Sequence, residues 1–144
     1  MRVTDRIAQG LLRPINPYST LILGFFTALW GLWVLLPQWS VFEHAQLFSR
    51  MAQFCPEWAW GSWAMTAGIL IIVGVARGFY KSLSWALGFT VWHWATVASM
   101  LWWGDWQNTG GLTYTAIAVF TTYAYLNIKV NQVKFGEDIP HFLP

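Results

Sequence analysis

One histidine in the middle of a long apolar run is the residue with the clearest potential for chemistry. His93 lies in VWHWATVASMLWWGDW (91–106), which also holds five of the chain's twelve tryptophans. An imidazole in an apolar setting can ligate the metal of haem or of a chlorophyll-type pigment, relay protons, or bond to a neighbouring side chain. These roles make different demands on the rest of the chain.

Haem or pigment binding by His93 lacks supporting residues. A haem held by two histidines needs a second ligand at the same depth, but His44 and His141 lie outside the apolar runs. Two copies of the chain could pair their His93 residues. A pigment needs one ligand beside a small residue, and the bulky Phe89 stands four positions before His93. We expect no cofactor and favour a structural or hydrogen-bonded His93, with a haem or chlorophyll-type pigment as the alternative.

Patterns typical of enzymes and metal sites are missing. The sequence contains no HExxH, no glycine-rich phosphate loop and no GxSxG. The single cysteine, Cys55, excludes an intrachain disulfide and a CxxC site. All acidic residues fall outside the apolar runs, which disfavours a transporter built on a buried carboxylate. We expect neither catalytic nor metal-binding residues.

Four apolar runs are long enough to hold this histidine in a membrane, since a helical span takes about 20 residues. They cover residues 18–37, 58–76, 82–104 and 111–128. The composition is 56% hydrophobic and only 10% charged, unlike a soluble domain. Unbroken runs are not typical of a membrane barrel, whose strands alternate. We predict a single-domain, all-α integral membrane protein with four transmembrane helices.

Two further segments are expected at the membrane surface. Residues 41–55 alternate polar and apolar residues at helical spacing, which predicts an amphipathic interfacial helix between the first and second spans. Pro56 then ends that helix. Residues 1–16 show a weaker amphipathic pattern, with a basic side suited to anionic lipid. Residues 129–144 are predicted to form a cytoplasmic tail.

Basic and aromatic residues predict the orientation. Because basic residues in short loops stay in the cytoplasm, both termini are expected there. One side carries Arg2, Arg6, Arg13, Arg77, Lys81, Lys129 and Lys134, and the other only Arg50. Tryptophan favours the membrane boundary, and six map to the non-cytoplasmic one as predicted interfacial anchors: Trp39, Trp58, Trp60, Trp102, Trp103 and Trp106.

Small residues predict where helices approach one another, because helices in lipid associate by close packing. The predicted packing pairs are Gly24 with Ala28, Ala64 with Gly68, Gly74 with Gly78, and Ala95 with Ser99. Packing within one bundle is the favoured interpretation, and a subunit interface is the alternative. The fourth span also carries a possible polar face, which would line water or bond across helices: Thr115, Thr122 and Tyr125.

The first half of the chain resembles a known group of proteins. INPYSTLILGFFTALWGLWVLLP, a loop and CPEWAWGSWAMTAGILIIVG resemble small four-helix membrane proteins of unknown function encoded by tailed bacteriophages. The marks of the resemblance are Pro17, Trp30, Gly31, Trp33, Pro56, Glu57, Trp58 and Gly61. It implies a location in the bacterial inner membrane and supplies no site residues.

These patterns predict a non-enzymatic, multi-pass protein of the bacterial inner (cytoplasmic) membrane, acting as a structural or interaction subunit of a membrane assembly. The expected partners are the lipid bilayer and either copies of the chain or other membrane subunits. No nucleic-acid partner is expected, because topology explains the basic residues. One alternative is an oligomeric pore-former, such as a holin or small channel. The other is a haem- or pigment-binding redox or light-harvesting subunit ligated through His93.

Overall fold

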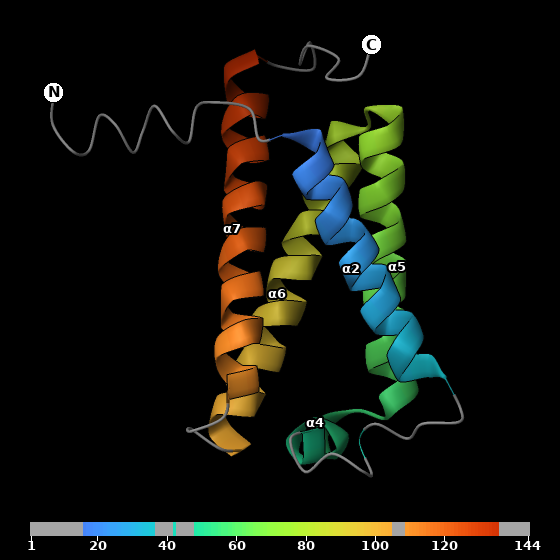
Figure 1. Cartoon of the computed structure of the whole chain (residues 1–144). Coiled ribbons are helices and arrows are strands. Elements are labelled where there is room, and N and C mark those ends of the chain that lie inside the picture. The colour runs from blue at the N-terminus through green and yellow to red at the C-terminus, as the bar shows by residue number, and fades with distance from the viewer. Residues whose placement is uncertain (1–15, 37–41, 43–47, 105–108, 136–144) are drawn as a thin grey trace, which may run out of the picture.

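The fold is a bundle of antiparallel helices. The computed structural model of the chain describes residues 16–36, 42, 48–104 and 109–135, and these contain no strand. Four long helices form the bundle, α2 (Pro17–Leu35), α5 (Glu57–Arg77), α6 (Tyr80–Gly104) and α7 (Thr109–Phe135), and a short helix, α4 (Ser49–Phe54), lies at one end (Figure 1). The prediction of an all-α fold is confirmed for these described residues.

The helices follow the apolar runs closely, except at the end of the chain. Helix α7 continues to Phe135, beyond the predicted end at Ile128, because no proline or glycine interrupts residues 129–135. Of the predicted interfacial helix, 41–55, the structure describes Phe42 and residues 48–55, which include α4. The predicted segment 1–16, apart from Asn16, and the end of the predicted tail, 136–144, lie outside the described residues.

Local sequence signals define several helix ends. Helix α2 begins with proline at its first position, and the Asn16 side chain accepts a hydrogen bond from the Tyr18 amide at 3.0 Å. Helix α5 ends at Gly78, which has a φ of 68° in the left-handed region that glycine tolerates. Gly78 was predicted to pack against another helix, but it ends α5 and turns the chain into α6 instead.

Glycines bring α2 and α5 into backbone contact. A methyl group placed on Gly68 would lie 2.6 Å from the carbonyl oxygen of Gly24, and one on Gly31 would lie 2.6 Å from that of Gly61. We call Gly24, Gly31, Gly61 and Gly68 the glycine seam. Ala28, from a predicted packing pair, also contacts Gly68 across this seam, and Ala64 is buried on α5. A side chain on the seam would force the helices apart.

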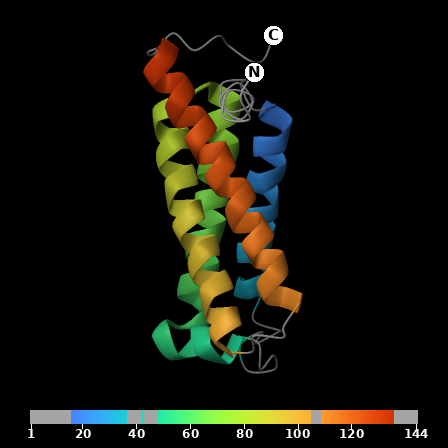
Figure 2. The same ribbon diagram turned by 90° about the vertical axis from the view of Figure 1, so that its left-hand side faces the viewer.

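Contacts between the other helices complete the antiparallel register. Gly74 of α5 faces Leu83 of α6, and Gly88 of α6 faces Tyr125 of α7. Figure 2, viewed from the α7 side, shows α7 inclined across the front of the bundle, between α6 and α2. Helices α2 and α6 therefore begin, and α5 and α7 end, at the same end of the molecule (Figure 1).

Charged residues lie near the two ends of the bundle. We call the end carrying Arg77, Lys81 and Lys129 the basic end. The opposite end carries Arg50 and Glu57 and is called the α4 end. Between them, the helices carry no Asp, Glu, Lys or Arg.

Large apolar side chains are exposed on the outside of the bundle, and eight polar side chains of the described residues are buried inside it beside the apolar core. Large apolar side chains are exposed on all four long helices, among them Ile22, Phe25, Leu29, Ile69, Leu70, Trp85, Trp92, Leu112, Val119 and Leu126. Buried polar side chains come from α2, α6 and α7: Thr20, Thr27, Ser84, Thr90, His93, Thr121, Asn127 and Asn131. Within the described residues, α2 and α5 are long and apolar enough to cross a membrane.

Candidate functional site

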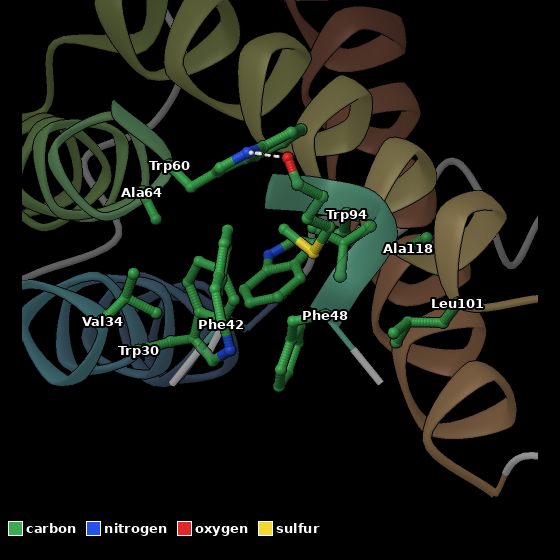
Figure 3. Close-up of a cluster of buried hydrophobic side chains, with 11 residues drawn as sticks. Trp30, Val34, Phe42, Phe48, Trp60, Ala64, Trp94, Leu101 and Ala118 are labelled. Carbon is green, nitrogen blue, oxygen red and sulfur yellow. Dashed lines mark hydrogen bonds between the residues drawn. The ribbon is translucent and has the colours of Figure 1, made fainter. Parts of the chain in front are cut away.

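His93 lies fully buried in α6, among indole rings from three helices. Its ring centroid is 5.2 Å from that of Trp30 in α2, 5.8 Å from Trp60 in α5 and 4.9 Å from the neighbouring Trp94. Tyr114 of α7 contacts both Trp30 and Trp94. We call Trp30, Trp60, Trp94 and Tyr114 the aromatic cage. Figure 3 shows the three tryptophans of the cage within the buried cluster.

Every indole N–H of the cage has an acceptor. Trp30 Nε1 donates to the Tyr114 hydroxyl at 2.9 Å, which joins α2 to α7. Trp94 Nε1 donates to Thr27 Oγ1 at 3.3 Å, which joins α6 to α2. Trp60 Nε1 donates to the Met51 carbonyl at 3.3 Å, which holds α4 against the bundle (Figure 3). Buried indoles need such partners, so these bonds fix the orientation of the rings.

The imidazole of His93, unlike the indoles, has no hydrogen-bond partner among the described residues, at either Nδ1 or Nε2. The ring meets Trp30 and Trp94 edge to face, at interplanar angles of 74° and 76°. An aromatic face is a weak acceptor for N–H but offers nothing to a lone pair. The expected hydrogen bond to a threonine or tyrosine is therefore not made, and His93 packs against indoles instead.

The surroundings of His93 do not fit a haem or a chlorophyll-type pigment. A macrocycle needs flat free space beside one ring nitrogen, and three indole rings with centroids within 5.8 Å fill that space. In the part of the chain that the structure describes, no group of three or more His, Cys, Asp or Glu side chains could hold a metal ion. The arrangement around His93 is that of a packed core.

Aromatic and sulfur side chains close the cage on its α4 side. Phe48 and Met51 are buried there, and Phe42 stacks on Phe48 with ring centroids 5.5 Å apart (Figure 3). Trp60, predicted as an interfacial anchor, is buried in this cluster because α4 folds back and supplies its acceptor. The described end of the predicted interfacial helix thus packs Phe48 and Met51 onto the bundle.

The other predicted anchors are distributed along the α4 end. Trp58 and Trp103 are strongly exposed, as an anchor requires. Trp102 is partly exposed, and its Nε1 donates to Thr115 Oγ1 at 2.9 Å. Trp39 and Trp106 lie outside the described residues.

A groove of about 590 Å³ runs between α6 and α7 on the surface of the bundle. Ala95 and Ser99, predicted as a packing pair, are exposed in its wall. Thr115 and Thr122 of the predicted polar face also line the groove, while Tyr125 packs against Gly88. The structure thus separates Ala95 and Ser99 from the pairs buried between α2 and α5.

The threonines of the groove present little polarity to their surroundings. Thr115 Oγ1 donates to the Gly111 carbonyl at 2.7 Å, and Thr122 Oγ1 donates to the Ala118 carbonyl at 2.8 Å. Because each hydroxyl is bonded within its own helix, the groove is lined mainly by apolar atoms. It suits a hydrocarbon chain or an apolar helix better than water.

Comparison of the chain with protein-family models, with curated proteins and with solved structures found no match.

Proposed function

We propose that the chain is a four-span protein of the bacterial inner membrane, with both termini in the cytoplasm, and a non-enzymatic interaction subunit of a membrane assembly. The resemblance to phage-encoded membrane proteins agrees with that location. The proposal has two parts, the membrane placement and the assembly, and different observations support them.

The distribution of polarity supports membrane placement of all four long helices. Helices α6 and α7 are less apolar than α2 and α5 by composition, but polar side chains such as Ser84, His93 and Asn127 face the interior. Their outward side chains are largely apolar. At 1.5 Å per residue, helices of 25 and 27 residues are roughly 37 and 40 Å long, enough to cross about 30 Å of hydrocarbon.

The observation that carries the assembly is the groove between α6 and α7. Ala95 and Ser99 leave the backbone of α6 accessible on a surface that would face lipid. Helices in membranes associate where small residues permit such close approach. Gly24 and Gly68, from the predicted pairs on α2 and α5, are covered by the neighbouring helix, whereas Ala95 and Ser99 are exposed.

The two alternative functions have less support. A pore would need a polar face toward water, but the hydroxyls of the threonine-rich face bond within α7. Within a single chain, the aromatic cage fills the bundle at the level of His93. The same cage leaves no room for a redox cofactor on His93.

Photocrosslinking in intact membranes tests the assembly. A photoreactive phenylalanine derivative replaces Ser99 in one variant and Ile69, an exposed residue of α5, in the control. We expect a protein adduct of defined mass from position 99 alone, and its loss when Ala95 is also changed to Phe. Equal yields of lipid adducts only, at both positions, would contradict the assembly.

Cysteine labelling tests the membrane placement independently. Cys55 is exposed at the α4 end and is the only cysteine of the chain. A membrane-impermeant maleimide added to cells whose outer membrane has been made permeable should label Cys55. In a Cys55→Ser background, Lys81→Cys should be labelled only in inverted membrane vesicles. The reverse pattern would overturn the orientation without affecting the crosslinking result.

A further inference from the structure

Four buried polar side chains of three helices share one level near the basic end. The contact of Gly74 with Leu83 places Ser84 level with residue 73 of α5. The contact of Gly68 with Gly24 places residue 73 level with residue 19 of α2, next to Thr20. Since neighbouring helices are antiparallel, their residue numbers increase in opposite directions along the bundle axis. Thr20 and Ser84 therefore lie at almost the same height.

The register of α6 with α7 adds two asparagines to this level. Because Gly88 faces Tyr125, Ser84 is level with residue 129 of α7. Asn127 and Asn131 lie two residues to either side, roughly 3 Å along a helix that rises 1.5 Å per residue. We call Thr20, Ser84, Asn127 and Asn131 the polar layer. All four side chains are buried, with at most 4% of their surface exposed.

Three oxygen atoms of the polar layer have no hydrogen-bond partner among the described residues: Thr20 Oγ1, Ser84 Oγ and Asn131 Oδ1. The inward hydroxyls elsewhere in the bundle behave differently. Thr27, Thr90 and Thr121 each donate to the carbonyl four residues earlier, at 2.7 to 2.8 Å. The two hydroxyls of the layer depart from this pattern, although a buried oxygen without a partner is unfavourable.

The hydrogen-bonding capacity of the three oxygens indicates which ligand they can bind. Asn131 Nδ2 donates to the Asn127 carbonyl at 2.8 Å, so the unpartnered atom of that amide is the oxygen, which can only accept. An acceptor oxygen disfavours an anion. The layer has no carboxylate, and Arg77, Lys81 and Lys129 lie at the same end, which disfavours a cation. Water both donates and accepts, and it matches two hydroxyls and an amide oxygen.

We propose that the polar layer is a buried water-binding site that fills from the basic end. The layer lies about one turn inside the first residues of α2 and α6, so water has a short way to enter. One turn deeper, the fully packed Leu23, Ile71, Leu87 and Ala124 form an apolar barrier. The cytoplasmic part of the bundle interior is therefore wet and the part beyond this barrier is dry. This inference requires the bundle in a bilayer but not the proposed assembly.

Water-edited solid-state NMR on the full chain tests the site directly. The protein is reconstituted in vesicles of phosphatidylethanolamine and phosphatidylglycerol, and the transfer of magnetisation from water to assigned side chains is followed. We expect transfer to Ser84 and Asn131 to be several-fold faster than transfer to Thr90, whose hydroxyl is bonded within its helix. Equally slow transfer to all three residues would overturn the proposal.

Isosteric variants give a second test, because the melting temperature should change in opposite directions in a hydrated layer and in a dry one. Thr20→Val removes a hydroxyl at nearly constant volume, and Thr90→Val is the matched control. If water is bound, Thr20→Val leaves it short of a partner, and the melting temperature falls by at least as much as in the control. If the layer is dry, the variant removes an unsatisfied group and the melting temperature rises, which would contradict the site. A melting temperature that depends on whether sodium or potassium is present would show an ion in place of water, and would also overturn it.

Discussion

At His93, contacts with three tryptophan rings replace the hydrogen-bond partners that a buried imidazole usually has. The position of this residue could be predicted from the sequence, because a lone ionisable group in an apolar run is conspicuous. Its surroundings could not, because Trp30, Trp60 and Tyr114 are distant in the sequence and come from three other helices. Nothing local to residue 93 indicates that they converge.

Substitution of His93 distinguishes packing from polar function. His93→Phe should keep or raise the stability of the bundle, because it removes two buried nitrogens without partners, each unfavourable by about 1–3 kcal/mol. His93→Ala should lower the free energy of unfolding by about 2–5 kcal/mol, because it leaves a cavity. Tryptophan fluorescence during denaturation in mixed micelles measures both. A loss from Phe as large as that from Ala would show that a ring nitrogen makes an essential bond.

The bond between Trp30 and Tyr114 predicts a second effect at the residue level. Tyr114→Phe leaves the buried Trp30 N–H without its acceptor, so the free energy of unfolding should fall by about 1–3 kcal/mol. Tyr18→Phe, at an exposed position, is the control and should change stability little. The same denaturation assay applies. Equal stability of the two variants would mean that the bond contributes nothing to holding α2 against α7.

Among the elements, the pair α2 and α5 is held at the glycine seam. Pairs of small residues four apart in the sequence indicate Gly24 and Gly68 as packing positions, but they do not indicate Gly31 and Gly61. Glycines seven apart on both helices, 24 with 31 and 61 with 68, are the signal that would have identified them. The burial of Trp60 was missed for another reason, since its acceptor is a backbone carbonyl of α4 that the local sequence does not reveal.

A methyl group is enough to test the glycine seam. Gly31→Ala would place Cβ against the Met65 amide and the Gly61 carbonyl, and backbone atoms cannot rotate away. We expect a loss of about 1–3 kcal/mol in the free energy of unfolding, as in other overpacked cores. In the matched control, Gly88→Ala, the new Cβ meets only the Tyr125 ring, at 3.4 Å, an ordinary contact. Similar losses in both variants would rule out the seam as the special contact.

At the scale of the whole molecule, composition predicted the helical class but not the arrangement of polarity. Asn127 and Asn131 mark the stretch of α7 where the apolar run fades, so the sequence placed the end of the helix too early. In the fold, these same residues are buried inside the bundle, and Leu126 and Lys129 are exposed beside them. A hydropathy average along the sequence combines the residues on all sides of a helix. In the bundle, one helix can bury polar side chains and expose apolar ones.

The two pairs of helices should also hold together when the chain is divided. Separate expression of residues 1–78 and 79–144 in one cell should give two fragments that co-purify, because α5 packs against α6 near the basic end and α2 bonds to α6 and α7. Gly31→Leu in the first fragment should weaken its binding to the second and expose α2 to protease, because it displaces the helix whose Thr27 and Trp30 bond to α6 and α7. Fragments that do not associate would show that the covalent turn at Gly78 is needed to bring α5 and α6 together.

The left-handed turn at Gly78 and the glycine seam together bear on how the protein is made. All the glycines that join α2 to α5 have been synthesised before α6 begins, so the first pair of helices can close while the ribosome is still translating. Helices α6 and α7 would then enter the membrane beside an α2–α5 pair that has already formed. Biogenesis would proceed as the addition of one hairpin, α6 with α7, to another, α2 with α5.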